Sequence, residues 1–165
     1  MFPDDLRNRA AELLSKAETA GLMTASAESC TGGLVAALMT EIPGSSNVVE
    51  RGFVTYSNEA KTEMLGVPAA LIESHGAVSR EVALAMAEGA LMKSNADLAV
   101  SITGVAGPGG SGRKPAGLVH FALAARGHKT RAMVKRLGDQ GRSRVRMKSV
   151  ETALDLLSEG VDLFA

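Results

Sequence analysis

Apolar positions along the chain follow two patterns, a helical repeat of about 3.6 residues and short, nearly continuous runs. The helical repeat covers residues 3–20, where leucines and alanines recur on one side of an amphipathic segment that stops at Gly21. The apolar run at 98–103 is typical of a strand that is buried on both faces. The two patterns together predict a protein that mixes helices with a buried sheet.

The rest of the chain continues this alternation. Val, Phe and Thr in 48–56 predict a second strand, because β-branched and aromatic residues favour strands. Ser79 is the expected N-cap of a long helix, rich in Ala and Met, that ends near Asn95. The other predicted elements are a strand at 21–25, helices at 34–39 and 58–65, a short helix from residue 68, a strand pair at 117–125 and 130–137 around a turn at 126–129, and a last helix at 141–164.

This order of elements predicts the fold class. Strands that alternate with helices and end in a hairpin favour an α/β fold. We expect a three-layer α/β/α sandwich around a mixed, mostly parallel sheet, formed by a single domain over residues 1–165. The hydrophobic content of 45% is enough for a core without disulfide or metal cross-links.

Composition excludes some classes of binding partner. Eighteen basic residues balance eighteen acidic ones, and aromatic residues are scarce, so we expect neither nucleic acid nor a membrane surface as a partner. One cysteine cannot form an internal disulfide, and the chain shows neither a leader segment nor an apolar run long enough for a membrane span. These features predict a cytoplasmic protein.

Three polar loops follow predicted strands, at 26–33, 56–61 and 103–112. In open α/β sheets, ligands bind outside the carboxyl ends of the strands, so we expect these loops to line one pocket. The glycine-rich loop at 103–112 is neither a nucleoside-triphosphate loop nor a dinucleotide fingerprint, because it is followed by Lys114-Pro115 and a strand rather than a helix. A flexible glycine hairpin without a binding role is the alternative there.

The loop 26–33, Ser-Ala-Glu-Ser-Cys-Thr-Gly-Gly, gathers a carboxylate, hydroxyls, a thiol and two glycines in front of a predicted helix. Free N–H groups at a helix start attract anions, and glycines allow close approach, so this helix start is a candidate phosphate site. The alternative is that Ser29 or Thr31 simply caps the helix.

Tyr56 and Lys61 form the second candidate group, at the end of a strand and in the first turn of the next helix. A lysine near the positive end of a helix tends towards a lowered pKa, and a neutral lysine can take a proton from a serine hydroxyl. The serine is either Ser46, just before the strand, or Ser29. The alternative is a surface lysine beside a half-buried tyrosine.

Cys30 is a competing nucleophile, since a helix start would lower the pKa of its thiol, although single cysteines are commonly buried core residues. The three histidines lack metal-ligand spacing, so no metal site is expected. Arg142 and Arg146, in the basic run at the start of the last predicted helix, are candidates to hold a phosphate, and the alternative is that this run is a solvated helix face.

Five segments together give the chain a resemblance to the CinA C-terminal domain family over nearly its whole length. They are Ala27-Glu-Ser-Cys-Thr-Gly-Gly, Gly44-Ser-Ser, Gly52-Phe-Val-Thr-Tyr-Ser-Asn-Glu-Ala-Lys, Gly76-Ala-Val-Ser and Ser101-Ile-Thr-Gly-Val-Ala-Gly-Pro-Gly-Gly.

The resemblance implies an amidohydrolase that converts nicotinamide mononucleotide to nicotinic acid mononucleotide and ammonia without a metal or other cofactor. It places a Ser-Tyr-Lys catalytic group on Ser46, Tyr56 and Lys61, and it gives Ser29 a contact with the substrate. From its position in the polar loop, Ser29 is also the second candidate nucleophile. Candidate substrate-binding residues are Glu28, Thr31, Gly32, Gly33, Asn58, Thr103, Gly104, Gly107, Arg142 and Arg146.

Two other functions remain open at this point. One is a non-catalytic nucleotide-binding module connected with competence or the DNA-damage response, as the historical name of the family implies. The other is an amidohydrolase that uses Cys30. We also expect a homodimer, because the first helix and the helix at 79–95 are apolar enough to cover an interface; the alternative is that both helices belong to the core.

Overall fold

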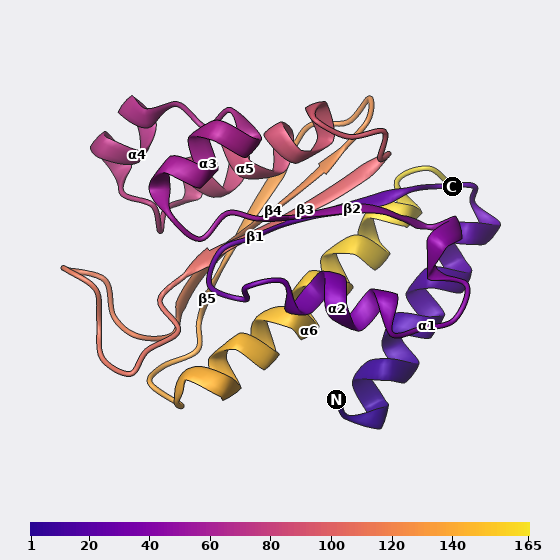
Figure 1. Ribbon diagram of the computed structural model, residues 1–165, viewed down its shortest axis with the longest axis horizontal. Helices are drawn as coiled ribbons and strands as arrows, with labels where there is room; N and C mark the ends of the chain where they lie inside the picture. Colours follow the sequence, from indigo (N-terminus) through magenta and orange to yellow (C-terminus); the bar gives the residue numbers. More distant parts are fainter.

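Five strands form one sheet in the middle of the molecule, in the order β2-β1-β3-β4-β5. The computed structural model describes residues 1–165, and Figure 1 shows the sheet between two groups of helices. β1 pairs in parallel with β2 and β3, whereas β4 is antiparallel to both β3 and β5, so that four of the five strands run in the same direction. The elements are α1 (Asp4–Thr19), β1 (Thr24–Glu28), α2 (Leu34–Thr40), the 3-10 turn η1 (Ser45–Asn47), β2 (Val49–Val54), α3 (Asn58–Leu65), α4 (Ala69–His75), α5 (Arg80–Met92), β3 (Leu98–Gly104), β4 (Leu118–Ala125), β5 (Arg131–Arg136) and α6 (Arg142–Asp162).

The helices cover both faces of the sheet, which confirms the predicted three-layer arrangement. α1, α2 and α6 lie on one face, and α3, α4 and α5 lie on the other (Figure 1). The larger core, between the sheet and the first group, contains Leu98, Phe121 and Leu157, all essentially buried. A smaller core on the opposite face contains Val82 and Met86 of α5. The molecule is therefore a single α/β domain.

Local sequence signals account for the starts of two helices, α3 and α5. The Ser57 hydroxyl accepts a hydrogen bond from the Ala60 N–H at the start of α3, and the Ser79 hydroxyl accepts one from the Val82 N–H at the start of α5. Each cap satisfies an N–H group that the first turn of a helix leaves free. The Ser79 cap was predicted from the sequence.

One predicted strand is misplaced. The expected strand at 21–25 is in fact Thr24–Glu28, so the first three of the eight residues of the polar motif 26–33 belong to β1. All five residues of β1 are buried, including Ser26 and Glu28. Polar residues in a strand argue against burial unless they are hydrogen-bonded. Here the Ser26 hydroxyl donates to the Glu28 carboxylate, whose other partners lie in α2.

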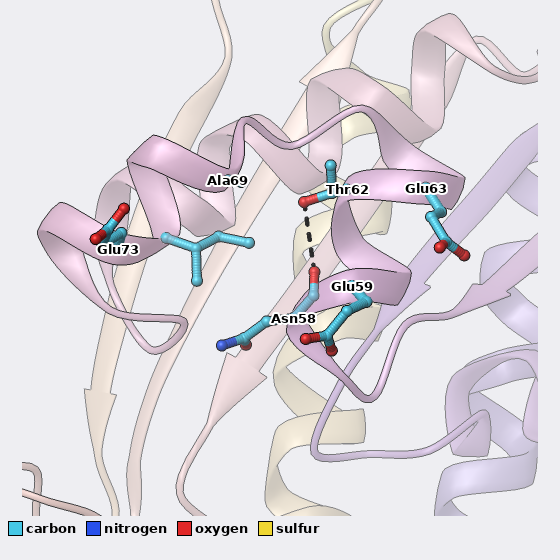
Figure 2. Close-up of a pocket in the computed structure, with 7 residues that line it drawn as sticks. Asn58, Glu59, Thr62, Glu63, Ala69 and Glu73 are labelled. Atoms are coloured by element: carbon cyan, nitrogen blue, oxygen red, sulfur yellow. Dashed lines mark hydrogen bonds between the residues drawn. The ribbon is translucent and has the colours of Figure 1, made fainter.

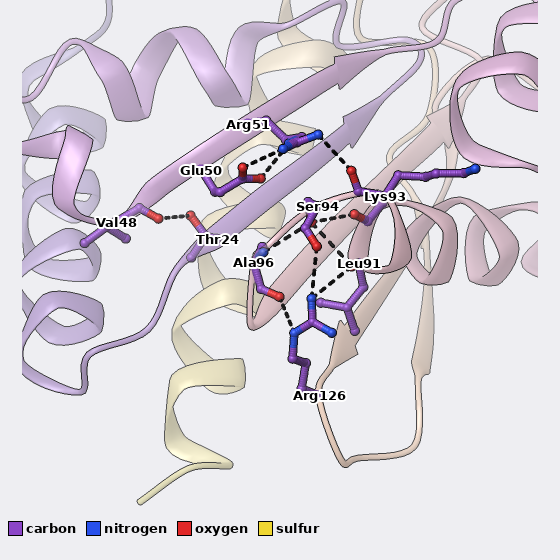
Figure 3. A network of polar contacts seen from close by, with 10 residues as sticks. Thr24, Val48, Glu50, Arg51, Leu91, Lys93, Ser94, Ala96 and Arg126 are labelled. Carbon is purple, nitrogen blue, oxygen red and sulfur yellow. Dashed lines mark hydrogen bonds and ion pairs between the residues drawn. The ribbon is translucent and has the colours of Figure 1, made fainter.

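Backbone-directed polar contacts hold the sheet at the amino ends of its parallel strands (Figure 3). The Arg126 guanidinium donates to the carbonyls of Ala96, Ser94 and Leu91, which fixes the β4–β5 hairpin to the end of α5. Arg51 pairs with Glu50 and donates to the Lys93 carbonyl. These groups are used within the protein, which leaves the opposite edge, at the carboxyl ends of β1, β2 and β3, as the place to look for a site.

None of the helices is both long enough and apolar enough to span a bilayer.

Candidate active site

Lys61 and Ser29 meet at the carboxyl edge of the sheet. The distance from Lys61 Nζ to Ser29 Oγ is 3.1 Å. Ser29 directly follows β1, and Lys61 lies in the first turn of α3, which follows β2. Because β1 and β2 are parallel neighbours, their carboxyl ends bring these two residues together, although 32 positions separate them in sequence.

The Lys61 side chain is buried, with only 1% of the residue exposed. Besides Ser29, its Nζ contacts backbone carbonyls, at 3.0 Å from Thr55 and 3.4 Å from both Tyr56 and Ser57. No carboxylate forms an ion pair with it. Burial lowers the pKa of Lys61 below its ordinary value of 10.5, because removal from water penalises the ammonium form. A neutral Nζ would keep a lone pair for the Ser29 hydroxyl hydrogen.

The first candidate nucleophile, Ser46, is not brought to Lys61. It lies in η1, exposed, before β2 begins, whereas Lys61 follows the end of β2. A six-residue strand separates the two edges by about 20 Å. The pairing of Ser46 with Lys61 was therefore wrong, and Ser29 takes this place. Proximity in sequence to β2 suggested Ser46, but the pairing of β1 with β2 decides the contact.

The turn at 29–33 carries Ser29 from β1 into α2. Gly32 and Gly33 have φ values of +59° and +96°, which favour glycine. The predicted free N–H groups at this helix start are not free. Both oxygens of the buried Glu28 carboxylate accept hydrogen bonds there, from the N–H groups of Gly33, Val35 and Ala36, at 3.0–3.1 Å. The predictions of a phosphate site at this helix start and of Glu28 as a substrate ligand are thus corrected.

Arg146 of α6 contacts the same turn from the other side. Its Nε donates to the Cys30 carbonyl and its Nη2 to the Thr31 carbonyl, both at 3.1 Å. Thr31 is fully buried, and its hydroxyl has no hydrogen-bond partner. Arg146 and Thr31, both predicted as substrate ligands, therefore lie at the site, but the arginine is engaged with the protein backbone.

A second cluster lies beside this turn and includes Tyr56, Gly107 and Arg142. The Arg142 guanidinium donates to the Tyr56 hydroxyl at 2.8 Å and to the Gly107 carbonyl at 3.0 Å. Tyr56 is 62% exposed, and its hydroxyl faces Arg142 rather than Lys61, so its expected role as a proton relay has no direct contact in its support. The cluster lines a cavity of about 290 Å³, together with Gly104 and the rest of the glycine-rich loop.

The glycine-rich loop is fixed at its base. The Thr103 hydroxyl donates to the Ala77 carbonyl at 2.7 Å, and Lys114 Nζ donates to the carbonyls of His75 and Val78. Thr103, a predicted substrate ligand, thus uses its hydroxyl to hold the connection between α4 and α5. Lys114 was not singled out from the sequence, because its partners are backbone atoms 36 and 39 positions away.

The start of α6 has no cap. Gly141 in the N-cap position offers no side chain, and the first turn contains no acidic residue. The first intrahelical bond starts at the Val145 N–H, so the N–H groups of residues 142–144 are open. Such a start, with an arginine in its first turn, favours an anion. Arg142 was already a phosphate candidate from the sequence, and the glycine in place of a Ser, Thr, Asp or Asn cap at position 141 is a second sequence signal for this helix start.

Cys30 faces away from this chemistry. Its side chain belongs to the larger core and is 5% exposed. Burial raises the pKa of the Cys30 thiol to about 11, although the expectation from the helix start was a lowered value. A thiol in this state is a poor nucleophile at neutral pH, which argues against the cysteine alternative.

Asn58, another predicted substrate ligand, lies outside the Ser29–Lys61 region. It lines a groove of about 470 Å³ between α3 and α4, together with Glu59, Glu63 and Glu73 (Figure 2). The Asn58 carbonyl accepts a hydrogen bond from the Thr62 hydroxyl. This groove is acidic and contains neither of the paired residues. No group of three or more potential metal ligands occurs in the molecule.

Charges are distributed unevenly, although they sum to zero. Residues 113–148 contain eleven of the eighteen basic residues and one of the eighteen acidic ones. Several of these basic residues lie at the carboxyl edge of the sheet, in the glycine-rich loop, at the end of β5 and in the first turns of α6. The edge that carries Ser29 and Lys61 is therefore basic, and the α3–α4 groove is acidic.

Comparison with known proteins gives one consistent result. The model of the CinA C-terminal domain matches residues 6–161. A competence/damage inducible protein from Agrobacterium tumefaciens, of known crystal structure, is 51% identical, with a TM-score of 0.92 over 95% of this chain and 96% of that chain. A competence damage-inducible protein from Klebsiella pneumoniae is 34% identical, with a TM-score of 0.91 over 95% and 97% of the two chains.

Curated sequences agree with these structures but are longer. A CinA-like protein from Citrifermentans bemidjiense is 50% identical over 159 residues, which are 95% of this chain and 38% of that protein. A CinA-like protein from Akkermansia muciniphila is 57% identical over 111 residues, which are 67% of this chain and 27% of that protein. The chain thus spans well under half the length of these curated relatives.

Proposed function

We propose a function for this chain on the basis of its family, because the chain belongs to the CinA C-terminal domain family. The proposed function is hydrolysis of the carboxamide of nicotinamide mononucleotide to a carboxylate and ammonia. The observation that carries the proposal is the 3.1 Å contact between Ser29 Oγ and the buried Lys61 Nζ. The resemblance to the family supplies the substrate, and the serine–lysine pair supplies the chemistry.

Ser29 is the nucleophile in this mechanism, and Lys61 is the general base. The neutral Lys61 amine takes the hydroxyl proton while Ser29 Oγ bonds to the carboxamide carbon, which the cationic pyridinium ring makes electron-poor. The lysine then gives its proton to the leaving nitrogen, and ammonia departs from an acyl-serine. Water attacks this ester with Lys61 again as the base. The proton returns to Ser29 Oγ as the nucleotide acid leaves.

Backbone N–H groups next to the nucleophile are suited to stabilise the tetrahedral oxyanion. The N–H groups of Cys30 and Thr31 donate to no protein acceptor, whereas the Ser29 N–H donates to the Ile102 carbonyl and the Gly32 N–H to the Ser29 carbonyl. N–H donors held in place before the reaction stabilise charge that develops in the transition state.

The 5′-phosphate needs an anion site close to the serine, and the open start of α6 is better suited than α2. The N–H groups of Arg142, Ser143 and Arg144 are free there, and the Arg142 guanidinium already faces the cavity at the glycine-rich loop. The start of α2 is occupied by Glu28. We therefore assign the phosphate to Arg142 and the first turn of α6.

The test is to incubate the purified chain with nicotinamide mononucleotide and to measure ammonia and the nucleotide acid. We expect turnover by the unaltered chain and a loss of at least about 100-fold in Lys61→Met and Ser29→Ala, the usual scale for a catalytic base or nucleophile. Ser15→Ala, on the exposed side of α1, is the matched serine control. Full activity of Ser29→Ala with loss in Ser46→Ala would refute the assignment. Tight binding of the nucleotide without product would instead favour a non-catalytic module.

A further inference from the structure

We infer that Glu28 and Arg146 are positioning residues, which hold the turn 29–33 from two sides so that Ser29 faces Lys61. This inference rests on the proposed role of Ser29. It gives the two residues a function different from substrate binding, and it explains why a carboxylate and a guanidinium lie next to a nucleophile that neither of them touches through its side chain.

Glu28 fixes the turn from within the sheet. Its carboxylate accepts four hydrogen bonds, three from N–H groups of the 33–36 segment and one from the Ser26 hydroxyl, and the residue is fully buried. Its carbonyl accepts from the Thr55 N–H of the strand that leads to Lys61. One residue thus joins three parts, namely β1, the start of α2 and the segment in front of α3. Ser29 is the next residue in the chain.

The charge of Glu28 adds to this effect. A carboxylate at the amino end of a helix interacts favourably with the positive end of the helix dipole. Without the carboxylate, the N–H groups of Gly33, Val35 and Ala36 would lose their protein acceptor, which is most costly for the buried Val35 N–H. Glu28 therefore fixes the direction in which α2 leaves the turn. It also keeps any anion of the substrate away from this helix end.

Arg146 fixes the turn from α6. Its bonds go to the carbonyls of Cys30 and Thr31. In a planar trans peptide the N–H points opposite to the carbonyl of the same unit. A fixed Cys30 carbonyl therefore sets the direction of the Thr31 N–H, one of the two free donors beside Ser29. A fixed Thr31 carbonyl sets the direction of the Gly32 N–H, which donates to the Ser29 carbonyl. Arg146 thus orients both peptide units that follow Cys30.

The experiment uses two readouts on the full chain. The first is hydrolysis of nicotinamide mononucleotide, with kcat and KM measured separately over pH. The second is the rate at which phenylmethanesulfonyl fluoride labels Ser29, followed by mass spectrometry, which depends on the nucleophile and not on the nucleotide. The variants are Glu28→Gln, Glu28→Ala and Arg146→Lys, and Glu63→Gln on the exposed side of α3 is the matched control.

We expect Glu28→Ala to lose at least about tenfold in both kcat and labelling rate, with a change of less than about threefold in KM, because small displacements of a reacting group slow a reaction strongly. Formate, a carboxylate small enough for the vacated volume, should restore part of both rates. Glu28→Gln keeps the shape of the side chain and one acceptor oxygen, so its kcat and labelling rate should lie between those of the unaltered chain and Glu28→Ala. It replaces Glu28→Ala as the test variant if Glu28→Ala does not fold. Arg146→Lys, which can keep at most part of the bidentate contact, should also lose labelling rate.

Three results would overturn the inference. A rise in KM at unchanged kcat and labelling rate would make Glu28 a substrate ligand. A lowered unfolding midpoint with normal labelling would make its role structural only. Failure of the reagent to label Ser29 in the unaltered chain would show that Ser29 is not an activated nucleophile, which leaves nothing for Glu28 and Arg146 to position. If the chain does not hydrolyse the nucleotide but labelling of Ser29 still depends on Glu28 and responds to formate, the proposed function fails and the inference stands.

Discussion

A lysine that is buried without a carboxylate partner destabilises the folded protein, because its charged form loses its hydration. Lys61 is in this position, with backbone carbonyls and one serine hydroxyl as its only polar contacts. The carbonyl oxygens can accept hydrogen bonds from an ammonium, but they carry no full negative charge to offset its desolvation, and an apolar side chain of similar length would avoid that cost. A role that requires a neutral amine explains the residue better.

The pH dependence of stability tests this view. In the unfolded chain Lys61 has its ordinary pKa of 10.5, and in the folded protein its pKa is lower. As the pH falls below 10.5, the unfolded state binds a proton that the folded state does not, and stability is lost until the pH reaches the folded pKa. Relative to Lys61→Met, the unaltered protein should therefore gain stability as the pH rises towards 10.5, by at most about 1.4 kcal/mol per pH unit.

Urea unfolding at several pH values between neutrality and 10.5 measures this difference. Lys93→Met, which changes an exposed lysine, is the control and should show no such trend. A difference between Lys61→Met and the unaltered protein that stays constant over this range would mean that Lys61 is charged in the folded state.

At the scale of elements, the position of α3 decides whether Lys61 reaches Ser29. α3 packs on α5 where α5 has a glycine, Gly89, buried against the end of α3. A Cβ at Gly89 would lie 2.0 Å from the Leu65 carbonyl oxygen, so any side chain must push the two helices apart. The close approach of α3 to α5 therefore requires a glycine at position 89.

Gly89→Ala should accordingly destabilise the protein, although alanine is the better helix former. We expect a net loss of about 1–3 kcal/mol, the usual cost of overpacking. The shift of α3 should also lower the proposed activity, with most of the effect on kcat. Glu88→Ala, on the exposed neighbour in the same helix, should leave both quantities nearly unchanged. Equal stability of the two variants by thermal or urea unfolding would contradict the close contact.

Most of the elements can be predicted from the sequence, because their apolar spacing and their caps agree. The helix at 58–65 and the cap at Ser79 are examples. The first strand is misplaced because the partners that make Glu28 tolerable inside β1 lie in the following helix. The choice of Ser46 fails for a related reason. The parallel pairing of β1 with β2 places Ser29 next to Lys61, and this pairing cannot be read from the local sequence around Ser46. The pKa of Cys30 depends on burial, which no local motif reveals.

At the scale of the whole molecule, a formal net charge of zero conceals a basic edge. Charged side chains around a site raise the local concentration of an oppositely charged ligand, and salt screens this effect. The proposed substrate, nicotinamide mononucleotide, carries a phosphate, so the basic residues near the start of α6 should accelerate its capture.

The proposed reaction should therefore depend on ionic strength. We expect kcat/KM to fall several-fold between about 20 mM and about 500 mM NaCl, since the Debye length shrinks over this range. Lys135→Gln at the carboxyl end of β5 should weaken the dependence. Lys129→Gln, which removes the same charge from the hairpin at the far edge, should not. A kcat/KM that does not change with salt would exclude electrostatic capture, whatever the mechanism of hydrolysis.

The separation of charge has a consequence for how the protein meets other surfaces. Its basic side includes the first turns of α6, and its acidic side includes the groove between α3 and α4. A molecule with such a dipole can turn either side towards a charged surface. Near neutral pH and at low salt, this chain should therefore be retained by both anionic and cationic chromatography media. Its net charge alone would predict that neither retains it.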